Sequence, residues 1–410
     1  YETSLEGKRM YIQREEQAVV NKVSGQFKTL LVTGPRQVGK STMLKHVAPG
    51  RPYISLDLIT ARDLADSDPS LFLQRYKPPV LIDEIQYAPN LFPAIKSIVD
   101  QDENNGLFWL TGPQQFHLMP HVSESLAGRI AILRLLGLSQ RELQGWLKQK
   151  PFLPTENYLE SCRKRTSIAL DKVFHFIWKG SYPMLWTADV DWEIFYNSYF
   201  QTYLQRDVRN LTKVSNEMDF VRFVRAVAGR IGQQINFNSL ANDVGISQPT
   251  AKAWLSVLEA SGLVYFLPPY FNNRLKRLVK SPKLYFTDTG LASFLSGWLT
   301  EQAIEAGTMS GAFLENYAII EILKGYRNIG REPSLFYYRD TDGREIDLII
   351  EEAGMLYPIE IKKTSSPRAS MVKSFDVLPK EVRGKGALLS FVNEDVPLSA
   401  NVSAVPFFYL

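Results

Sequence analysis

Two groups of residues in this chain have types and spacing that could support chemistry, and the first lies near the N-terminus. The stretch GPRQVGKS matches the phosphate-binding pattern G-x-x-x-x-G-K-[ST] at every fixed position. In such a loop, backbone amides face a triphosphate, Lys40 adds a positive charge at the β- and γ-phosphates, and Ser41 binds Mg²⁺. A chance glycine-rich turn before a helix is the alternative. We expect ATP and Mg²⁺ to be bound by Gly34, Pro35, Arg36, Gln37, Val38, Gly39, Lys40, Ser41 and Thr42.

Two adjacent carboxylates follow an apolar segment farther along the chain. Residues 79–83 read PVLID, which is typical of a buried strand, so Asp83 is expected at the carboxyl end of that strand. From there Asp83 can hold Mg²⁺ through water, and Glu84 can orient or deprotonate an attacking water. A surface Asp–Glu pair at an ordinary strand end is the alternative explanation.

A third apolar segment, residues 107–111, ends in polar residues. Thr111, Gln114 and Gln115 lie where a sensor of the γ-phosphate is expected. Thr111 could equally be an ordinary strand-end residue.

The second chemical group lies in the last third of the chain. Predicted strands over residues 345–350 and 356–362 carry Asp347 on the first, and Glu360 and Lys362 on one face of the second, because side chains alternate along a strand. Two carboxylates and a neighbouring backbone carbonyl make a hard oxygen site for Mg²⁺ or Mn²⁺. A lysine beside that site can orient a water or balance charge on a phosphate.

This arrangement resembles the restriction-endonuclease-like fold, in which an Asp is followed by Glu-x-Lys and a helix upstream carries a Glu. All four positions are filled, by Glu315, Asp347, Glu360 and Lys362. The pattern alone is weakly specific, since any charged β-hairpin can match it. An inactive nuclease-like fold that binds nucleic acid or the ATPase is the alternative. Pro358 departs from a simple central strand, because it lacks the N–H that a ladder needs.

The elements around the phosphate loop indicate an α/β fold. Apolar strand-like segments alternate with helical ones, and Ser139 with Glu142 forms a capping box before a further helix. Such alternation predicts a parallel sheet covered on both faces, with the ligand at the carboxyl ends of the strands. The expected strands are residues 30–32, 52–57, 79–83, 107–111 and 130–135.

Several stretches resemble the predicted AAA+ superfamily ATPases of bacteria and archaea that carry a long C-terminal domain of unknown function. They are GPRQVGKST, LIDEIQ, LTGPQQF, SLAGRIAILRLLGLSQREL, YLQRDV, LANDVGIS, KSPKLYFTDTGL and EIDLII, so the resemblance covers nearly the whole chain. It implies a P-loop core of the additional-strand, catalytic-glutamate type. It also implies that Lys40, Ser41, Asp83 and Glu84 have the roles given above.

The region from about residue 151 to 234 has a helical pattern. Aromatic and apolar residues recur at a 3-4-3-4 spacing, which favours a buried helix face over a base-stacking surface. These residues are Trp192, Phe195, Tyr196, Tyr199, Phe200, Tyr203 and Leu204. An arginine can complete an ATP site from a neighbouring subunit. Arg129, Arg206 and Arg209 are candidates, with surface or ion-pair roles as the alternative.

A helix-turn-helix pattern follows. Residues 238–247 read as a short helix, a glycine turn and a new N-cap at Ser247, and a second helix runs from Gln248 to about Ser261. A strand over residues 263–267 then suggests a winged helix. The pattern predicts a DNA partner, and contacts to protein or to the ATPase domain are the alternative. Outward residues of the second helix and a basic stretch would contact DNA, namely Gln248, Thr250, Lys252, Arg274, Lys276, Arg277, Lys280 and Lys283.

Composition sets only broad limits. A net charge of +4 over 410 residues is too small to imply DNA by itself, and the single cysteine, Cys162, excludes intramolecular disulfides. No run approaches the roughly 18 apolar residues of a membrane span, and no signal-peptide h-region is present at the start. We expect a cytoplasmic protein that does not enter the membrane. Because the chain does not start with Met, a few N-terminal residues are expected to be missing.

These patterns predict four regions. They are a P-loop AAA-type ATPase domain (1–150), a helical lid or linker (151–235), a winged helix-turn-helix (236–290) and a restriction-endonuclease-like α/β domain (291–410). The predicted function is ATP hydrolysis coupled to action on DNA, with a metal-dependent nuclease under ATPase control. The alternatives are a regulatory switch with an inactive nuclease-like domain, and a remodeller of a protein partner. A homo-oligomer that supplies the arginine in trans is also expected.

Overall fold

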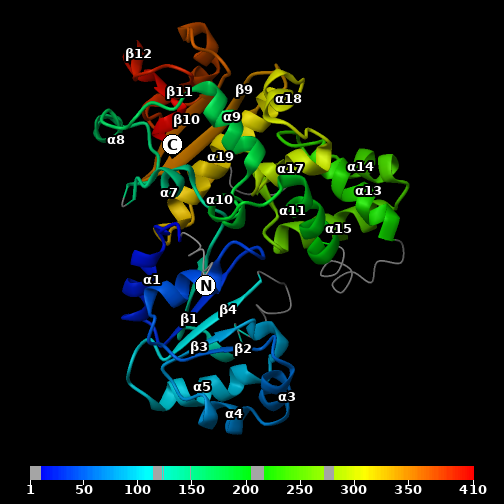
Figure 1. The fold of residues 1–410 in the computed structure, drawn as a ribbon. Helices are drawn as coiled ribbons and strands as arrows, with labels where there is room; N and C mark the ends of the chain where they lie inside the picture. Colours follow the sequence, from blue (N-terminus) through cyan, green and yellow to red (C-terminus); the bar gives the residue numbers. More distant parts are fainter. Residues whose placement is uncertain (1–10, 114–121, 123, 148, 205–216, 272–280) are drawn as a thin grey trace, which may run out of the picture.

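The computed structural model describes residues 11–113, 122, 124–147, 149–204, 217–271 and 281–410 (Figure 1). Several predicted functional residues lie outside these ranges. They are Gln114, Gln115, Arg206, Arg209, Arg274, Lys276, Arg277 and Lys280. The side chains of Tyr203 and Leu204 are likewise outside the description.

The N-terminal region is a parallel five-stranded sheet in the order β2-β3-β4-β1-β5, which confirms the predicted α/β core. β4 lies between β1 and β3, as the additional-strand type of P-loop core requires. Its strands are β1 (Thr29–Thr33), β2 (Tyr53–Ser55), β3 (Val80–Asp83), β4 (Phe108–Gly112) and β5 (Ile130–Arg134).

Helices cover both faces of this sheet. Alternate strand residues such as Leu30 and Leu31 pack into two different apolar clusters, one on each face. Residues of α1 and α2 belong to the cluster of Leu30, whereas α3, α4 and α5 pack in the cluster of Leu31. The helices are α1 (Gln17–Ser24), α2 (Lys40–Val47), α3 (Ile59–Ser67), α4 (Pro69–Arg75), the 3-10 turn η1 (Ile85–Tyr87), α5 (Leu91–Gln101) and α7 (Gln140–Gln144).

The middle region is helical, as predicted. Trp192, Phe195, Tyr196, Tyr199 and Phe200 are all at most 8% exposed, so the aromatic face is core and not a base-stacking surface. The elements are α8 (Glu156–Cys162), α9 (Leu170–Lys179), α10 (Met184–Thr187), α11 (Trp192–Tyr199) and the π-helical turn η2 (Phe200–Leu204).

Hydrogen bonds of two side chains connect this helical region to the C-terminal half of the chain. Asp288 accepts hydrogen bonds from the backbone N–H of Ser181 at 2.6 Å and from the hydroxyl of Tyr196 at 2.8 Å. Tyr158 of α8 donates to the carbonyl of Tyr409. The helices between the sheets therefore pack mainly on the C-terminal half of the chain.

The predicted helix-turn-helix is present. Asn236 caps α14, Gly245 ends that helix with a left-handed backbone, and Ser247 caps α15, so the first cap lies two residues before the predicted Asn238. A two-stranded antiparallel hairpin follows the second helix. The elements are α13 (Glu217–Ala228), α14 (Phe237–Val244), α15 (Gln248–Ala260), β6 (Val264–Leu267) and β7 (Lys283–Phe286).

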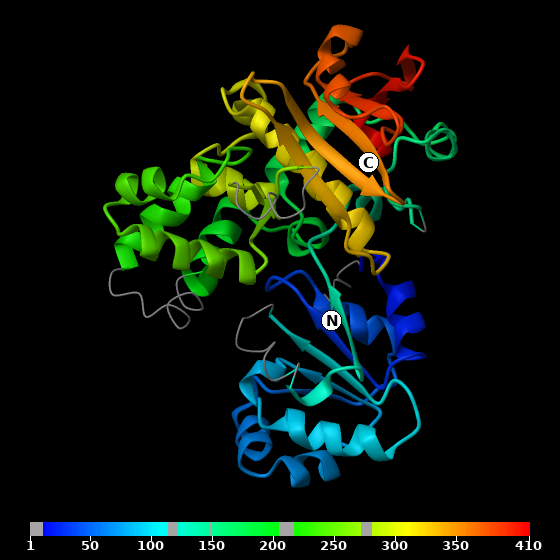
Figure 2. The ribbon, with the colours of Figure 1, turned by 180° about the vertical axis from the view of Figure 1, so that it is seen from behind.

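The C-terminal region is a separate mixed sheet packed on a long helix, α19 (Figure 2). Its six strands lie in the order β12-β13-β11-β10-β9-β8. Pro358 fits inside β10 because the pairing with β11 starts one residue later, at Ile359. The elements are α17 (Thr289–Ser296), α18 (Glu301–Ala306), α19 (Ser310–Arg327), β8 (Ser334–Arg339), β9 (Glu345–Glu352), β10 (Met355–Ile361), η3 (Ala369–Val377), β11 (Gly386–Ser390), β12 (Val396–Ser399), β13 (Val402–Pro406) and η4 (Phe407–Tyr409).

One apolar cluster joins the three regions. It runs from Leu30 beside the phosphate loop through Tyr196 of the middle helices to Leu389 in the last sheet. Within the described ranges, no helix is long and apolar enough to cross a membrane.

Candidate functional site

The phosphate loop leaves the carboxyl end of β1 and leads into α2. At Gly34 the backbone has φ +145°, and a Cβ there would lie 2.0 Å from the carbonyl oxygen of Leu135, so only glycine fits. Gly39, with φ +92°, starts α2 in the left-handed conformation. The loop thus ends at the N-terminus of α2, and a helix N-terminus is a favourable place for an anion.

Lys40 is buried at the start of α2, with 6% of its surface exposed. Its ammonium group donates to the carbonyl oxygens of Gly34 at 3.0 Å and Pro35 at 2.8 Å. Burial lowers the pKa of Lys40 to about 8, against the opposing charges of Glu84 and Asp83. A buried cation whose ammonium group donates to carbonyl oxygens would gain from the negative charge of a triphosphate.

The carboxylate of Asp83 joins the ends of four elements. Its Oδ1 accepts hydrogen bonds from the hydroxyls of Ser41, at 2.6 Å, and Thr111. Its Oδ2 accepts from the hydroxyl of Tyr53 at 2.9 Å. Sequence reasoning did not find Tyr53, which becomes a neighbour of Asp83 only because β2 pairs with β3.

Glu84 lies directly beyond Asp83 in a left-handed conformation, with φ +58°. Strained backbone of this kind at a non-glycine residue is common at functional sites. Its backbone N–H donates to the hydroxyl of Thr111 at 3.3 Å, and its carboxylate accepts from the side-chain amide of Gln86. The structure therefore brings Asp83, Glu84 and Thr111 together beside the phosphate loop, as the sequence predicted.

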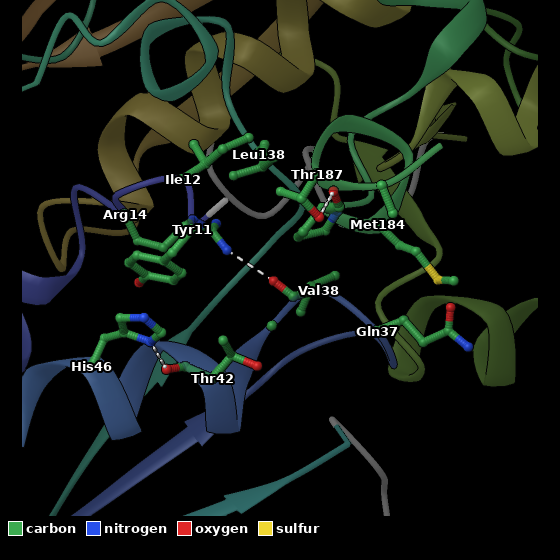
Figure 3. Close-up of a pocket in the computed structure, with 13 residues that line it drawn as sticks. Tyr11, Ile12, Arg14, Gln37, Val38, Thr42, His46, Leu138, Met184 and Thr187 are labelled. Atoms are coloured by element: carbon green, nitrogen blue, oxygen red, sulfur yellow. Dashed lines mark hydrogen bonds between the residues drawn. The ribbon is translucent and has the colours of Figure 1, made fainter. Parts of the chain in front are cut away.

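A pocket of about 420 Å³ opens next to the loop, between the N-terminal domain and α10 (Figure 3). The rings of Tyr11 and His46 stack on one side with their centres 3.6 Å apart. Met184 lines the opposite side, and Thr42 lies between them on α2. The size and mostly apolar lining suit a flat heterocycle attached to a bound triphosphate. The phosphate loop contributes Gln37, Val38, Gly39 and Thr42 to this pocket, whereas no sequence motif marked Tyr11, His46 or Met184.

Arg14 connects the phosphate loop with α7. Its guanidinium group donates to the carbonyl oxygens of Val38 and Leu136, both at 2.8 Å, and pairs with Glu142 at 2.8 Å. The Arg14 side chain is 3% exposed. Glu142 is also the capping-box residue of α7.

Two other arginines were expected near the nucleotide. Arg129 immediately precedes β5, at the amino end of the sheet beside Thr29, and pairs with Asp100. Because the phosphate loop is at the carboxyl end of the sheet, the structure does not bring Arg129 to it in the same chain. Arg36, within the loop, contacts the hydroxyl of Tyr87 at 3.4 Å.

The four nuclease-like positions converge in the C-terminal region. Asp347 on β9 accepts from the backbone N–H of Ile361 at 2.9 Å, and Lys362 lies 2.6 Å from Glu360 and 3.7 Å from Asp347. Glu315 approaches from α19. Burial and the charge of Asp347 raise the pKa of Glu315, so these side chains interact.

Glu360 is the least satisfied member of the cluster. It is 6% exposed, and its Oε2 is buried without a hydrogen-bond partner. Burial, together with the charge of Asp347, raises the pKa of Glu360 to about 7. Buried carboxylate oxygens that lack a protein partner are chemically suited to a hard divalent cation.

The position of Lys283 shows that one sequence prediction was wrong. Sequence reasoning assigned it to an exposed basic stretch, but it is 3% exposed. Its ammonium group lies 2.9 Å from Glu315 and 2.6 Å from Glu345. Burial opposes its charge, but Glu315 and Glu345 raise the pKa of Lys283 above its usual value. The first residue of β7 thus lies in the acidic cluster and is not available to DNA.

The sequence predicted two metal sites, one at the nucleotide and one in the C-terminal cluster, and the residues at these sites suit a metal ion to different degrees. At the nucleotide, Ser41 and Asp83 supply oxygen donors of the kind that Mg²⁺ binds. In the C-terminal cluster, Asp347 and Glu360 supply oxygen donors, but Lys362 already contacts both. Among the described residues, no three His, Cys, Asp or Glu side chains form a group arranged to hold a metal ion.

Three family models match the chain. One described as AAA domain covers residues 26–144, which include the phosphate loop, Asp83 and Glu84. One described as domain of unknown function (DUF8612) covers residues 170–302. One described as domain of unknown function (DUF4143) covers residues 310–410, which include Asp347 and Glu360.

Two related proteins match nearly the whole length of this chain. Two uncharacterised proteins, from Mycobacterium tuberculosis and Mycobacterium bovis, are each 29% identical over 401 residues, which is 97% of this chain and 84% of theirs. A solved Walker-type ATPase from Pyrococcus abyssi is 17% identical, with a TM-score of 0.41 over 70% of this chain and 98% of that protein. The phosphate loop and its paired carboxylates lie inside the matched AAA domain, so residues 26–144 form a P-loop domain of the AAA type, and a domain of unknown function follows at residues 310–410.

Proposed function

We propose that the protein binds DNA and cleaves it in a metal-dependent reaction that its ATPase domain controls. The supporting observation is the convergence of Glu315, Asp347, Glu360 and Lys362 in one cluster, from a helix and two neighbouring strands. These are the residue types that hold a divalent cation and orient a water for attack on a phosphodiester.

In the ATPase domain, residues 34–42 would bind the triphosphate, and Lys40, which now donates to two carbonyl oxygens, would donate to phosphate oxygens instead. Ser41 and Asp83 would hold Mg²⁺, which would stabilise the charge that develops on the phosphates. Glu84 orients the attacking water. The adenine ring would occupy the pocket between Tyr11 and Met184, so a bound nucleotide would contact both the AAA domain and α10.

In the C-terminal domain, Asp347 and Glu360 would hold the metal, and Glu315 would complete the acidic side of the site. A bound divalent cation would act as a Lewis acid on a phosphoryl oxygen. Lys362, whose side chain is 44% exposed, can reach a phosphate or orient the water.

DNA is the proposed substrate because of the helix-turn-helix. Gln248 and Lys252 are exposed at the start of α15, where such motifs contact base edges and phosphates. Thr250 is half-buried, and its hydroxyl bonds that of Ser247. Arg274, Lys276, Arg277 and Lys280 of the basic stretch lie outside the described residues and remain part of the proposal.

Cleavage of supercoiled and branched DNA tests this function. Wild-type protein should nick or cut DNA with Mg²⁺ or Mn²⁺, and Asp347→Ala should lose at least about a hundredfold in rate. Lys40→Ala should change the rate only through the ATP response. Asp342→Ala, which removes an exposed carboxylate from the turn before β9, is the matched control and should cleave normally. Cleavage by Asp347→Ala at the wild-type rate would contradict the proposal.

A second candidate is an ATP-dependent switch that binds DNA or a protein through an inactive nuclease-like domain. The contacts of Lys283 with Glu315 and of Lys362 with Glu360 favour it, because these carboxylates are already neutralised. Such a protein would hydrolyse ATP and respond to its partner, but would leave DNA intact in the assay above.

The ATPase site also needs an arginine to stabilise the transition state. We place this residue on a neighbouring subunit of a homo-oligomer, with Arg129, Arg206 and Arg209 as candidates. The position of Arg129 at the far end of the sheet leaves only this trans arrangement open to it.

A further inference from the structure

We propose that Lys283 of the β6–β7 hairpin is a built-in counter-cation of the acidic cluster, and that it weakens the binding of divalent metal there. This inference rests on the proposed metal site of the C-terminal domain. It adds a residue from outside the nuclease-like pattern, and it makes the metal affinity depend on the position of the hairpin.

The first support is the place of Lys283 in the fold. Lys283 begins β7, whose strand pairs with β6 and not with the C-terminal sheet. The side chain nevertheless crosses to the cluster, where its ammonium group contacts Glu315 of α19 and Glu345 of β9. One charge thus connects the hairpin, the long helix and the strand that carries Asp347.

The second support is the pair of hydrogen bonds that Glu315 accepts from β7. Lys283 and the hydroxyl of Tyr285, two residues later on β7, both donate to Oε1 of Glu315. Buried charges are retained in proteins only when they are paired, so the hairpin and the cluster stabilise each other when no metal is bound.

The third support is electrostatic. The charge of Lys283 acts on Asp347 as well as on Glu315 and Glu345, so the ammonium group is close to the proposed metal ligands. A fixed positive charge in a buried site opposes the entry of a second cation, because it repels that cation and neutralises part of the negative charge of the carboxylates. Movement of β7 away from α19 would remove this opposition and raise the affinity for metal.

Binding of Mn²⁺ alone, followed by electron paramagnetic resonance at pH 8 without nucleotide, tests the inference on the full chain. Lys283→Met should bind Mn²⁺ at least about tenfold more tightly than wild type, whereas Lys283→Arg should bind as wild type does. Lys283→Gln keeps a donor for Glu315 and serves if the methionine variant does not fold. Lys324→Gln is the control, because Lys324 is equally buried and paired with Glu321 outside the cluster.

The outcomes separate this inference from the proposed function. If Asp347→Asn abolishes Mn²⁺ binding but neutral variants at Lys283 bind with wild-type or lower affinity, Lys283 does not oppose the metal and the inference is wrong. If Asp347→Asn leaves Mn²⁺ binding unchanged, the metal site itself is wrong, and both proposals fail together.

Discussion

At the scale of single residues, the chain buries charged groups where function or coupling requires them. Lys40 is held by two carbonyl groups until phosphates arrive, and Lys283 is held by two carboxylates from another region. Glu16, just before α1, differs from both, because it is fully buried and neither carboxylate oxygen has a hydrogen-bond partner. Burial raises the pKa of Glu16 to about 8.

Glu16 should therefore make stability depend on pH. Its folded-state pKa lies above its unfolded value of 4.5, so the folded state holds the proton more tightly, and stability is lost as pH rises from about 4.5 to about 8. Replacing Glu16 by Gln should remove this loss. Each pH unit in that window is worth about 1.36 kcal/mol, so the wild type should lose roughly 3–4 kcal/mol relative to Glu16→Gln between pH 5 and 8.

Urea unfolding of both proteins at several pH values measures this difference. Glu193→Gln is a suitable control, because Glu193 is an exposed glutamate in the first turn of α11. Parallel pH profiles for wild type and Glu16→Gln would show that Glu16 is not protonated in the folded protein.

At the scale of elements, α19 connects the parts of the molecule. Asn316 bonds both backbone groups of Phe286 in β7, at 2.8 and 2.7 Å. One turn later, Glu321 accepts from the backbone N–H of Gln140 in α7 at 2.6 Å. The same helix carries Glu315. The β6–β7 hairpin and the AAA domain are thus both hydrogen-bonded to α19, the helix that carries Glu315 of the acidic cluster.

Asn316→Ala should loosen the hairpin from α19. The change leaves a buried N–H and a buried carbonyl of Phe286 without partners, which costs roughly 2–4 kcal/mol of unfolding free energy. Hydrogen exchange should increase in β7 more than in β1. Asn90→Ala, which removes an exposed asparagine bonded to Asp66, should change stability by less than about 0.5 kcal/mol. Unchanged exchange in β7 would show that Asn316 does not hold the hairpin.

At the scale of the whole molecule, the three regions share one apolar cluster, and Arg14 ties the phosphate loop to α7. The pocket beside the phosphate loop is itself bounded by the AAA domain and α10. Binding at the loop is therefore expected to stabilise the chain as a unit, and not only its first 150 residues.

Calorimetry with ATP and Mg²⁺ tests this expectation. At a ligand concentration about 100 times the dissociation constant, ATP should stabilise the folded protein by about 2.7 kcal/mol, in a single transition that moves as a whole. Lys40→Ala should remove the shift, whereas Lys45→Ala, on an outer face of the same helix, should retain it. Two transitions, with only one shifted by ATP, would show that the regions unfold independently.

The sequence by itself determined the parallel sheet and the ATP site. The apolar strands of the first domain, the phosphate loop, Asp83, Glu84 and the capping box at Ser139 depend on patterns a few residues long, which local geometry fixes. The helix-turn-helix and the strand positions of Asp347 and Glu360 were predictable for the same reason.

Only the tertiary structure decided which distant residues complete these sites. Tyr53 reaches Asp83 through strand pairing, Arg14 reaches Val38 across the core, and Lys283 enters the acidic cluster from another region. Such contacts depend on packing between elements far apart in sequence, which no local pattern records. A run of lysines and arginines looks alike in sequence whether its members face solvent or carboxylates, so the burial of Lys283 followed only from the fold.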